Sequence, residues 1–222
     1  ANAFKLDSLT QELKRTRSSQ KSHILLSDMV TKSPEMEKVA MLARRVTPLD
    51  TPLLIEGEVG TGKETLARAI SSGGTRWQGP FVAIDCRSLA KSNADQLLFG
   101  HSGARPINSV ETPIQIAGKI AEAQSGTLFF DEISALPYRT QLRLFELMQA
   151  SQYVTAGESA DLLANTRVIA SNSHSLAELV HMGRFHPGLY HLISSFSIEM
   201  PSLRNRIEDI PILAHQFLMH FA

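Results

Sequence analysis

Gly57-Glu58-Val59-Gly60-Thr61-Gly62-Lys63-Glu64 decides the fold of this chain. The apolar run before it, 51–56, predicts a buried strand, and the residues after it, 65–70, predict a helix. A glycine-rich loop between a strand and a helix is typical of a P-loop, whose backbone N–H groups curl around a phosphate. The helix N-terminus adds its dipole, and Lys63 supplies a point charge. The loop therefore predicts a nucleotide site, with a plain glycine-rich turn as the weaker alternative.

Apolar runs alternate with helical patterns along the rest of the chain. Five runs predict strands: Leu53–Ile55, Phe81–Ile84, Thr127–Phe130, Val168–Ala170 and Phe196–Met200. Helical patterns are clearest at Arg139–Ala150 and at Ser175–His181, the second begun by Ser173 or Ser175 as its N-cap. This alternation predicts an α/β fold with a parallel, doubly wound, five-stranded sheet flanked by helices.

Two segments fall outside this alternation. Residues 1–22 place Leu6, Leu9 and Leu13 at helical spacing in a polar, mildly basic stretch. This spacing predicts an amphipathic helix that either packs on its own domain or links domains or protomers. Residues 101–112 follow neither period and contain glycine, proline and asparagine, so we expect a long exposed loop there.

The composition is that of an ordinary soluble protein. In 222 residues, 22 Lys and Arg balance 22 Asp and Glu, so we expect any DNA contact in a domain outside this chain. No apolar run reaches the roughly 18 residues of a membrane span, and no signal pattern is present, which favours the cytoplasm and no membrane partner. The chain begins without methionine and ends in an apolar helical pattern, so we expect it to be part of a longer protein.

A second motif supports the phosphate site. The apolar strand predicted at 127–130 is followed directly by Asp131 and Glu132. In P-loop proteins the first such carboxylate faces Mg²⁺, and the next can polarise an attacking water. We therefore expect Asp131 to be the magnesium ligand and Glu132 the catalytic carboxylate. Without the P-loop, such a pair would more often cap a helix.

Several ordered motifs together resemble one family. They are Ser33-Pro34-Glu35-Met36, the loop Gly57–Glu64, Gly79-Pro80-Phe81-Val82, Leu98-Phe99-Gly100-His101, Gly126–Glu132 and Leu203–Pro211. From about Ser27 onward the chain resembles the AAA+ domain of bacterial enhancer-binding proteins, which use ATP to remodel RNA polymerase carrying sigma-54. The resemblance implies an AAA+ P-loop NTPase fold, ATP or ADP with Mg²⁺ as cofactor, a homo-oligomer (dimer or ring) and RNA polymerase as partner. It also implies that Asn172 senses phosphate in the catalytic site.

The same resemblance divides the chain into three parts. Residues 1–22 form a linker helix, residues 23–205 the AAA+ α/β nucleotide-binding core, and residues 206–222 the start of a helical lid that is largely missing. Within the family, this sequence is most similar to divergent regulators of biofilm formation.

The chain departs from the family at the residues on which the family's ATP-driven remodelling of RNA polymerase depends. The stretch 102–109 replaces the Gly-Ala-Phe-Thr-Gly-Ala loop by which the family touches sigma-54. His186 and Leu192 stand at the two positions where the family has arginines resembling arginine fingers. Losing such a finger costs about 10³ to 10⁵ in turnover, so we expect hydrolysis to be very slow or absent. Asp85 stands where the family most often has the asparagine that positions the catalytic glutamate.

These features favour a transcription regulator whose AAA+ domain senses a nucleotide but no longer drives a motor. The ligand is ATP or, as in some flagellar and biofilm regulators of the family, cyclic di-GMP. Five residues could pair with or stack on the second ligand: Arg44, Arg45, Arg68, Arg76 and Trp77. Two alternatives stay open: a working ATPase that remodels sigma-54 RNA polymerase, and an oligomerisation scaffold with a vestigial pocket.

Overall fold

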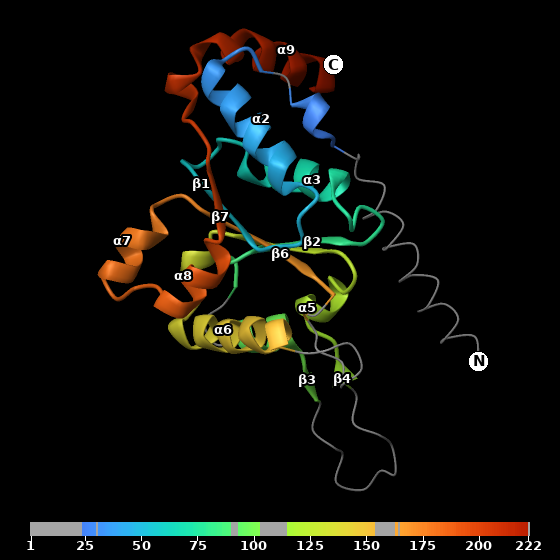
Figure 1. The fold of residues 1–222 in the computed structure, drawn as a ribbon, viewed down its shortest axis with the longest axis vertical. Helices are drawn as coiled ribbons and strands as arrows, with labels where there is room; N and C mark the ends of the chain where they lie inside the picture. Colours follow the sequence, from blue (N-terminus) through green and yellow to red (C-terminus); the bar gives the residue numbers. More distant parts are fainter. Residues whose placement is uncertain are drawn as a thin grey trace, which may run out of the picture.

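A five-stranded parallel sheet forms the centre of the protein (Figure 1). The computed structural model describes residues 24–29, 31–89, 93–102, 115–153, 163 and 165–221. The strands are β1 (Leu53–Glu56), β2 (Phe81–Asp85), β3 (His101–Ser102), β4 (Gln115–Ile116), β5 (Thr127–Asp131), β6 (Arg167–Asn172) and β7 (Phe196–Glu199). The α-helices are α2 (Pro34–Val46), α3 (Lys63–Gly73), α4 (Ala94–Phe99), α5 (Lys119–Glu122), α6 (Tyr138–Tyr153), α7 (Leu176–His181), α8 (Pro187–Ile193) and α9 (Ile210–Phe221). Short 3₁₀ turns are η1 (Leu26–Asp28), η2 (Ile133–Ala135), η3 (Leu203–Asn205) and η4 (Ile207–Asp209).

The sheet has the strand order β2-β5-β6-β1-β7, and every neighbouring pair is parallel. All five strands predicted from the sequence are therefore confirmed, together with the parallel α/β architecture. Because the strands are parallel, their carboxyl ends meet at one edge of the sheet, where such folds bind ligands. That edge carries the loop after β1 and the carboxylates at the ends of β2 and β5.

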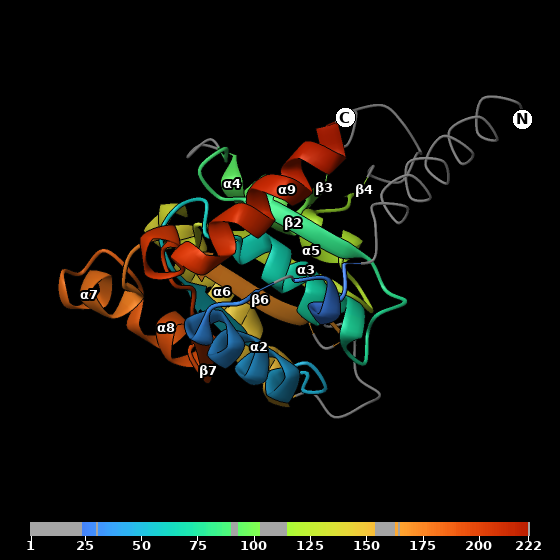
Figure 2. The same ribbon diagram turned by 90° about the horizontal axis from the view of Figure 1, so that it is seen from above.

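Helices cover both faces of the sheet and create two apolar cores. Alternate strand residues point to opposite faces, so Leu53 and Ile55 pack with α2 and α3 while Leu54 packs with α6 and α8. Figure 1 shows α2 and α3 above the sheet and α5 and α6 below it, and Figure 2 shows the same layers from above. Phe129 and Phe130, consecutive residues of β5, fill one core each and have no exposed surface. Burial on both faces explains why the central strands are continuous apolar runs.

The residues at the start of helix α2 explain why the helix begins there. Ser33 is its N-cap, accepting a hydrogen bond from Met36 N at 3.3 Å, and Pro34 occupies the first turn, where it needs no acceptor. Val39 and Ala43 continue the buried stripe that Met36 begins. The cap is itself held by Asp209, which lies 176 residues further along the chain.

The remaining expectations about organisation have mixed outcomes. The predicted linker helix 1–22 and residues 103–112 of the predicted loop lie outside the described residues. The loop prediction is wrong for its first two residues, which form β3 and pair with β4 as a short antiparallel ladder. Ser175 caps α7 by accepting from Glu178 N. The boundaries of the core and lid stay predictions. Among the described residues, no helix is long and apolar enough to cross a membrane.

Candidate functional site

The loop between β1 and α3 is shaped to receive an anion. Gly57, Gly60 and Gly62 have φ angles of 149°, 81° and 95°, which side-chain-bearing residues rarely adopt. Within the described chain, the backbone N–H groups of Gly60, Gly62 and Lys63 have no hydrogen-bond acceptor. A Cβ added at Gly60 would meet no atom within 4 Å, so open space lies beside these donors. Unbonded donors at the N-terminus of an 11-residue helix fit a nucleotide phosphate.

Lys63 lies at the centre of the site with its side chain only 6% exposed. Its Nζ donates to Gly57 O at 2.7 Å, Glu58 O at 3.2 Å and Ser173 Oγ at 3.1 Å. It also pairs with Glu132 Oε1 at 3.4 Å. The predicted cation and the predicted catalytic carboxylate are thus brought together, and loop carbonyls hold the ammonium group beside the phosphate cradle.

Glu132 has an unusual backbone conformation, with φ 54° and ψ 56°. A left-handed conformation at a residue other than glycine costs roughly 1–2 kcal/mol and is concentrated at functional sites. The buried Glu132 carboxylate accepts from Ser173 N at 3.1 Å and from the Ser173 hydroxyl. The strained backbone therefore presents a carboxylate whose direction Ser173 fixes.

Ser173, which the sequence suggested only as a helix cap, is the polar residue that joins Lys63 to Glu132. The neighbouring Asn172, assigned to phosphate sensing by resemblance, uses its side chain on backbone groups instead. It donates to His174 O at 2.8 Å and accepts from Ser134 N at 3.3 Å. The sensing role of Asn172 stays a prediction. Of the two residues, Ser173 is the one whose side chain contacts Lys63 and Glu132.

Asp131 is the one predicted metal ligand, and its carboxylate is already engaged. Oδ1 accepts from Ser171 Oγ at 2.7 Å, and Oδ2 lies 3.5 Å from Arg87 Nη2. No group of three or more His, Cys, Asp or Glu that could hold a metal exists in the described part of the chain. A Mg²⁺ ion here would rest on Asp131 and take its other oxygens from nucleotide phosphates and water, as Mg²⁺ commonly does. Glu64, where most P-loops have Ser or Thr, pairs with Arg68 at 2.6 Å.

The two positions expected to carry arginine fingers have structural contacts. His186 is the N-cap of α8: its Nδ1 accepts from Leu189 N at 3.1 Å, and its N–H donates to Gln141. Its ring lies 4.9 Å from that of Phe145, between centroids. Leu192 is partly buried against the core shared with α6. Neither side chain offers the fixed positive charge that a finger supplies.

The segment after β7 contacts the P-loop through two arginines. Arg204 donates to both carboxylate oxygens of Glu58, and the buried Arg206 donates to Thr61 O at 2.8 Å. The hydrogen bond from Arg204 lowers the pKa of Glu58, which therefore remains ionised. These contacts hold the glycine loop in place from the predicted boundary between core and lid.

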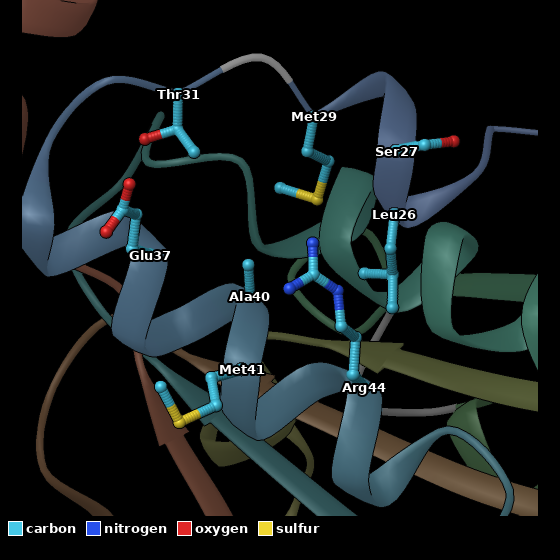
Figure 3. A pocket seen from close by; sticks show the side chains of 8 residues that line it. All are labelled: Leu26, Ser27, Met29, Thr31, Glu37, Ala40, Met41 and Arg44. Atoms are coloured by element: carbon cyan, nitrogen blue, oxygen red, sulfur yellow. The ribbon is translucent and has the colours of Figure 1, made fainter.

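The residues considered for cyclic di-GMP belong to separate clusters. Arg76 pairs with Asp50 at 3.2 Å, whereas Arg68 pairs with Glu64 and lies over the ring of Phe81. Arg44 lines a hollow of about 390 Å³ between η1 and α2, and its guanidinium points toward η1 (Figure 3). The hollow is lined by Leu26, Ser27, Met29, Thr31, Glu37, Ala40, Met41 and Arg44, and none of these belongs to the P-loop.

Cys86 should be unreactive in the folded protein. The thiol is buried at the end of β2, and burial together with the charges of Asp131 and Asp85 raises its pKa far above the ordinary value. Because the thiolate is the reactive form, we expect no labelling by a disulfide reagent at about pH 8, where a free thiol with pKa near 8.5 reacts readily. Unfolding in guanidinium should restore labelling of one thiol per chain, and rapid labelling in native buffer would contradict this prediction.

The fold and the glycine loop define a class: an α/β P-loop domain of the AAA+ type. The chain belongs to the Sigma-54 interaction domain family, whose model matches residues 29–199. It is 38% identical over 194 residues to the transcriptional regulatory protein ZraR of Escherichia coli K12, and 34% identical over 190 residues to the transcriptional regulator NtrC of Azospirillum brasilense. These alignments cover 87% and 86% of the chain but only 43% and 39% of the relatives.

Solved structures agree with this assignment. NtrX from Brucella abortus in complex with ATP matches with a TM-score of 0.74 and 27% identity, over 100% of this chain and 48% of NtrX. The P-loop NTPase domain of an E. coli sigma-54 activator matches with a TM-score of 0.52 and 24% identity, over 78% and 99% of the two chains. The second match supports the fold alone.

Proposed function

We propose that this chain is the ATP-sensing AAA+ domain of a DNA-binding transcription regulator that assembles into a homo-oligomer and hydrolyses ATP very slowly or not at all. Its partners would be further copies of itself, RNA polymerase carrying sigma-54, and DNA contacted through another domain. The observation that carries the proposal is the phosphate cradle of Gly60, Gly62 and Lys63, whose N–H groups are unbonded. The ATP complex of the related NtrX also supports a nucleotide ligand.

The slow hydrolysis that we propose follows from the residues around that cradle. Glu132 is held as a water-orienting carboxylate would be, by Ser173, and Lys63 is in place. The missing part is charge stabilisation from a neighbouring protomer, because His186 caps a helix and Leu192 packs against the core. A site that binds ATP but hydrolyses it very slowly can report nucleotide occupancy to the rest of the regulator.

ATP turnover by the full-length protein tests this proposal. We expect ATP to bind, and we expect turnover at least about 10³-fold below the roughly 1–10³ s⁻¹ of ordinary enzymes. Glu132→Gln is the matched control, since it keeps the size of the side chain and removes the carboxylate. Turnover of about 1 s⁻¹ or more that disappears in Glu132→Gln would establish the working-ATPase alternative. Absence of any ATP binding would leave the scaffold alternative.

Cyclic di-GMP is the second ligand to include in the same titration. The observation that favours it is the hollow beside Arg44, where a guanidinium faces apolar side chains such as Leu26 and Met29 (Figure 3). Arginine can stack on a base or pair with a phosphate. Cyclic di-GMP binding that survives Lys63→Ala and is lost in Arg44→Ala would place this ligand in the hollow and not in the P-loop.

A further inference from the structure

We propose that Arg87 stands in for part of the divalent-cation charge beside Asp131 and so makes nucleotide binding at this P-loop less dependent on Mg²⁺. This role rests on the proposed function, since it concerns the same phosphate site. Arg87 pairs with the carboxylates of the site and keeps donors for a phosphate oxygen, while the glycine loop and Lys63 hold the rest of the nucleotide.

The first step of the argument is the crowding of negative charge at the sheet edge. Asp85 and Asp131 are register partners at the carboxyl ends of the adjacent strands β2 and β5. Neighbouring strands lie about 4.8 Å apart, and like charges directly opposite one another are destabilising. Glu132 adds a third carboxylate, but Lys63 pairs with it at 3.4 Å. The two aspartates therefore need a second cation.

Arg87 is that cation. Its Nε lies 3.3 Å from Asp85 Oδ1 and its Nη2 lies 3.5 Å from Asp131 Oδ2, so one guanidinium spans both aspartates. Its backbone N–H also donates to Asp85 Oδ1 at 3.0 Å, an Asx-type turn that fixes where the side chain begins. The pairing of Asp85 and Arg87 thus gives a physical role to the aspartate that stands at the expected asparagine position.

The contacts of Asp131 show why a metal ion and Arg87 would compete. Ser171 donates to Oδ1, and Arg87 faces Oδ2, so both oxygens have a hydrogen-bond donor nearby. A Mg²⁺ ion would have to take an oxygen from a carboxylate that already has a cation beside it. Arg87 is 52% exposed, and its Nη1 has no acceptor within the described residues, so donors remain for a phosphate oxygen.

Calorimetric titration of the full-length protein with ATP, in Mg²⁺ and in EDTA, tests the role directly. We expect wild-type affinities in the two buffers to agree within about threefold, and Arg87→Ala to lose about tenfold in EDTA alone, the size of one charge-assisted hydrogen bond. Arg87→Lys should keep most of the Mg²⁺-independent binding. Arg143→Ala is the control, since Arg143 is equally half-exposed and pairs with a different aspartate, Asp95, at 3.8 Å. Equal Mg²⁺ dependence in wild type and Arg87→Ala would overturn the role.

A second measurement needs no nucleotide. In Arg87→Ala the like charges of Asp85 and Asp131 are unopposed, so added Mg²⁺ should raise its melting temperature more than that of the wild type. Replacing Asp85 by asparagine in the same variant should remove this extra response. A wild-type protein that binds no ATP would refute the proposed function, while this measurement would still decide the role of Arg87. The same response to Mg²⁺ in wild type and Arg87→Ala would refute that role.

Discussion

Replacing Lys63 by alanine should lower the affinity for ATP at least about 100-fold. Lys63 is the buried cation at the N-terminus of α3. Its Nζ donates to Gly57 O and Glu58 O, beside the loop N–H groups that have no acceptor. Hydrogen bonds to charged groups contribute about 1.5–3 kcal/mol each. Losing two of them to phosphate oxygens corresponds to about 100-fold or more, at 1.4 kcal/mol per factor of ten.

The matched control for this variant is Lys119→Ala. Lys119 is 46% exposed and pairs with Glu122 in the same short helix, so its removal takes away one lysine charge without touching the P-loop. Calorimetric titration with ATP should give wild-type affinity for Lys119→Ala, and circular dichroism should show all three proteins folded. If Lys63→Ala binds ATP within about threefold of the wild type, the ligand does not rest on the P-loop lysine.

Much of the fold could be predicted from the sequence because its signals are local. The central strands are buried on both faces, so runs such as Leu128–Phe130 are apolar throughout and easy to place. The helix after the P-loop follows from the loop itself. The pairing of β3 with β4 could not be predicted, since two residues on each side leave no periodicity to detect. The strand order depends on packing between distant segments and left no local signal either.

The candidate site divides in the same way. Lys63, Asp131 and Glu132 lie in motifs whose chemistry is visible at short range, and the structure brings them to one sheet edge. Ser173 and Arg87 were missed because the motif residues they contact are remote in sequence: Ser173 lies 110 residues from Lys63, and Arg87, although it also pairs with the nearby Asp85, lies 44 residues from Asp131. A serine or an arginine has many uses, so residue type alone could not assign these two.

Asp209→Ala should lower the free energy of unfolding by about 3 kcal/mol, because Asp209 is the buried acceptor that ties η4 to the start of α2. It is 1% exposed and accepts from Lys32 N at 2.6 Å, Ser33 N at 3.1 Å, Ser33 Oγ at 3.1 Å and Thr31 Oγ1 at 3.2 Å. Its loss leaves the Ser33 N–H buried without an acceptor and frees the cap of α2. Breaking a buried charged network of this kind costs several times the effect of a surface change.

Denaturant unfolding measures this loss, and Glu208→Ala is the control, since Glu208 is the exposed carboxylate beside Asp209. We expect Glu208→Ala to stay within about 0.5 kcal/mol of the wild type. A loss below about 1 kcal/mol in Asp209→Ala would mean that this link does not hold the two segments together.

The same link predicts how stability depends on pH. Burial raises the pKa of Asp209, but the hydrogen bonds from Lys32, Ser33 and Thr31 outweigh it, and the net pKa is lower than usual. A depressed pKa gives stability that is fully present above about pH 4, the unfolded value, and is lost as pH falls through the folded value. Asp209→Asn should therefore be less stable than the wild type at neutral pH and should lose less stability between about pH 4 and pH 2. If the two proteins lose equal stability over this pH range, the loss arises from other carboxylates.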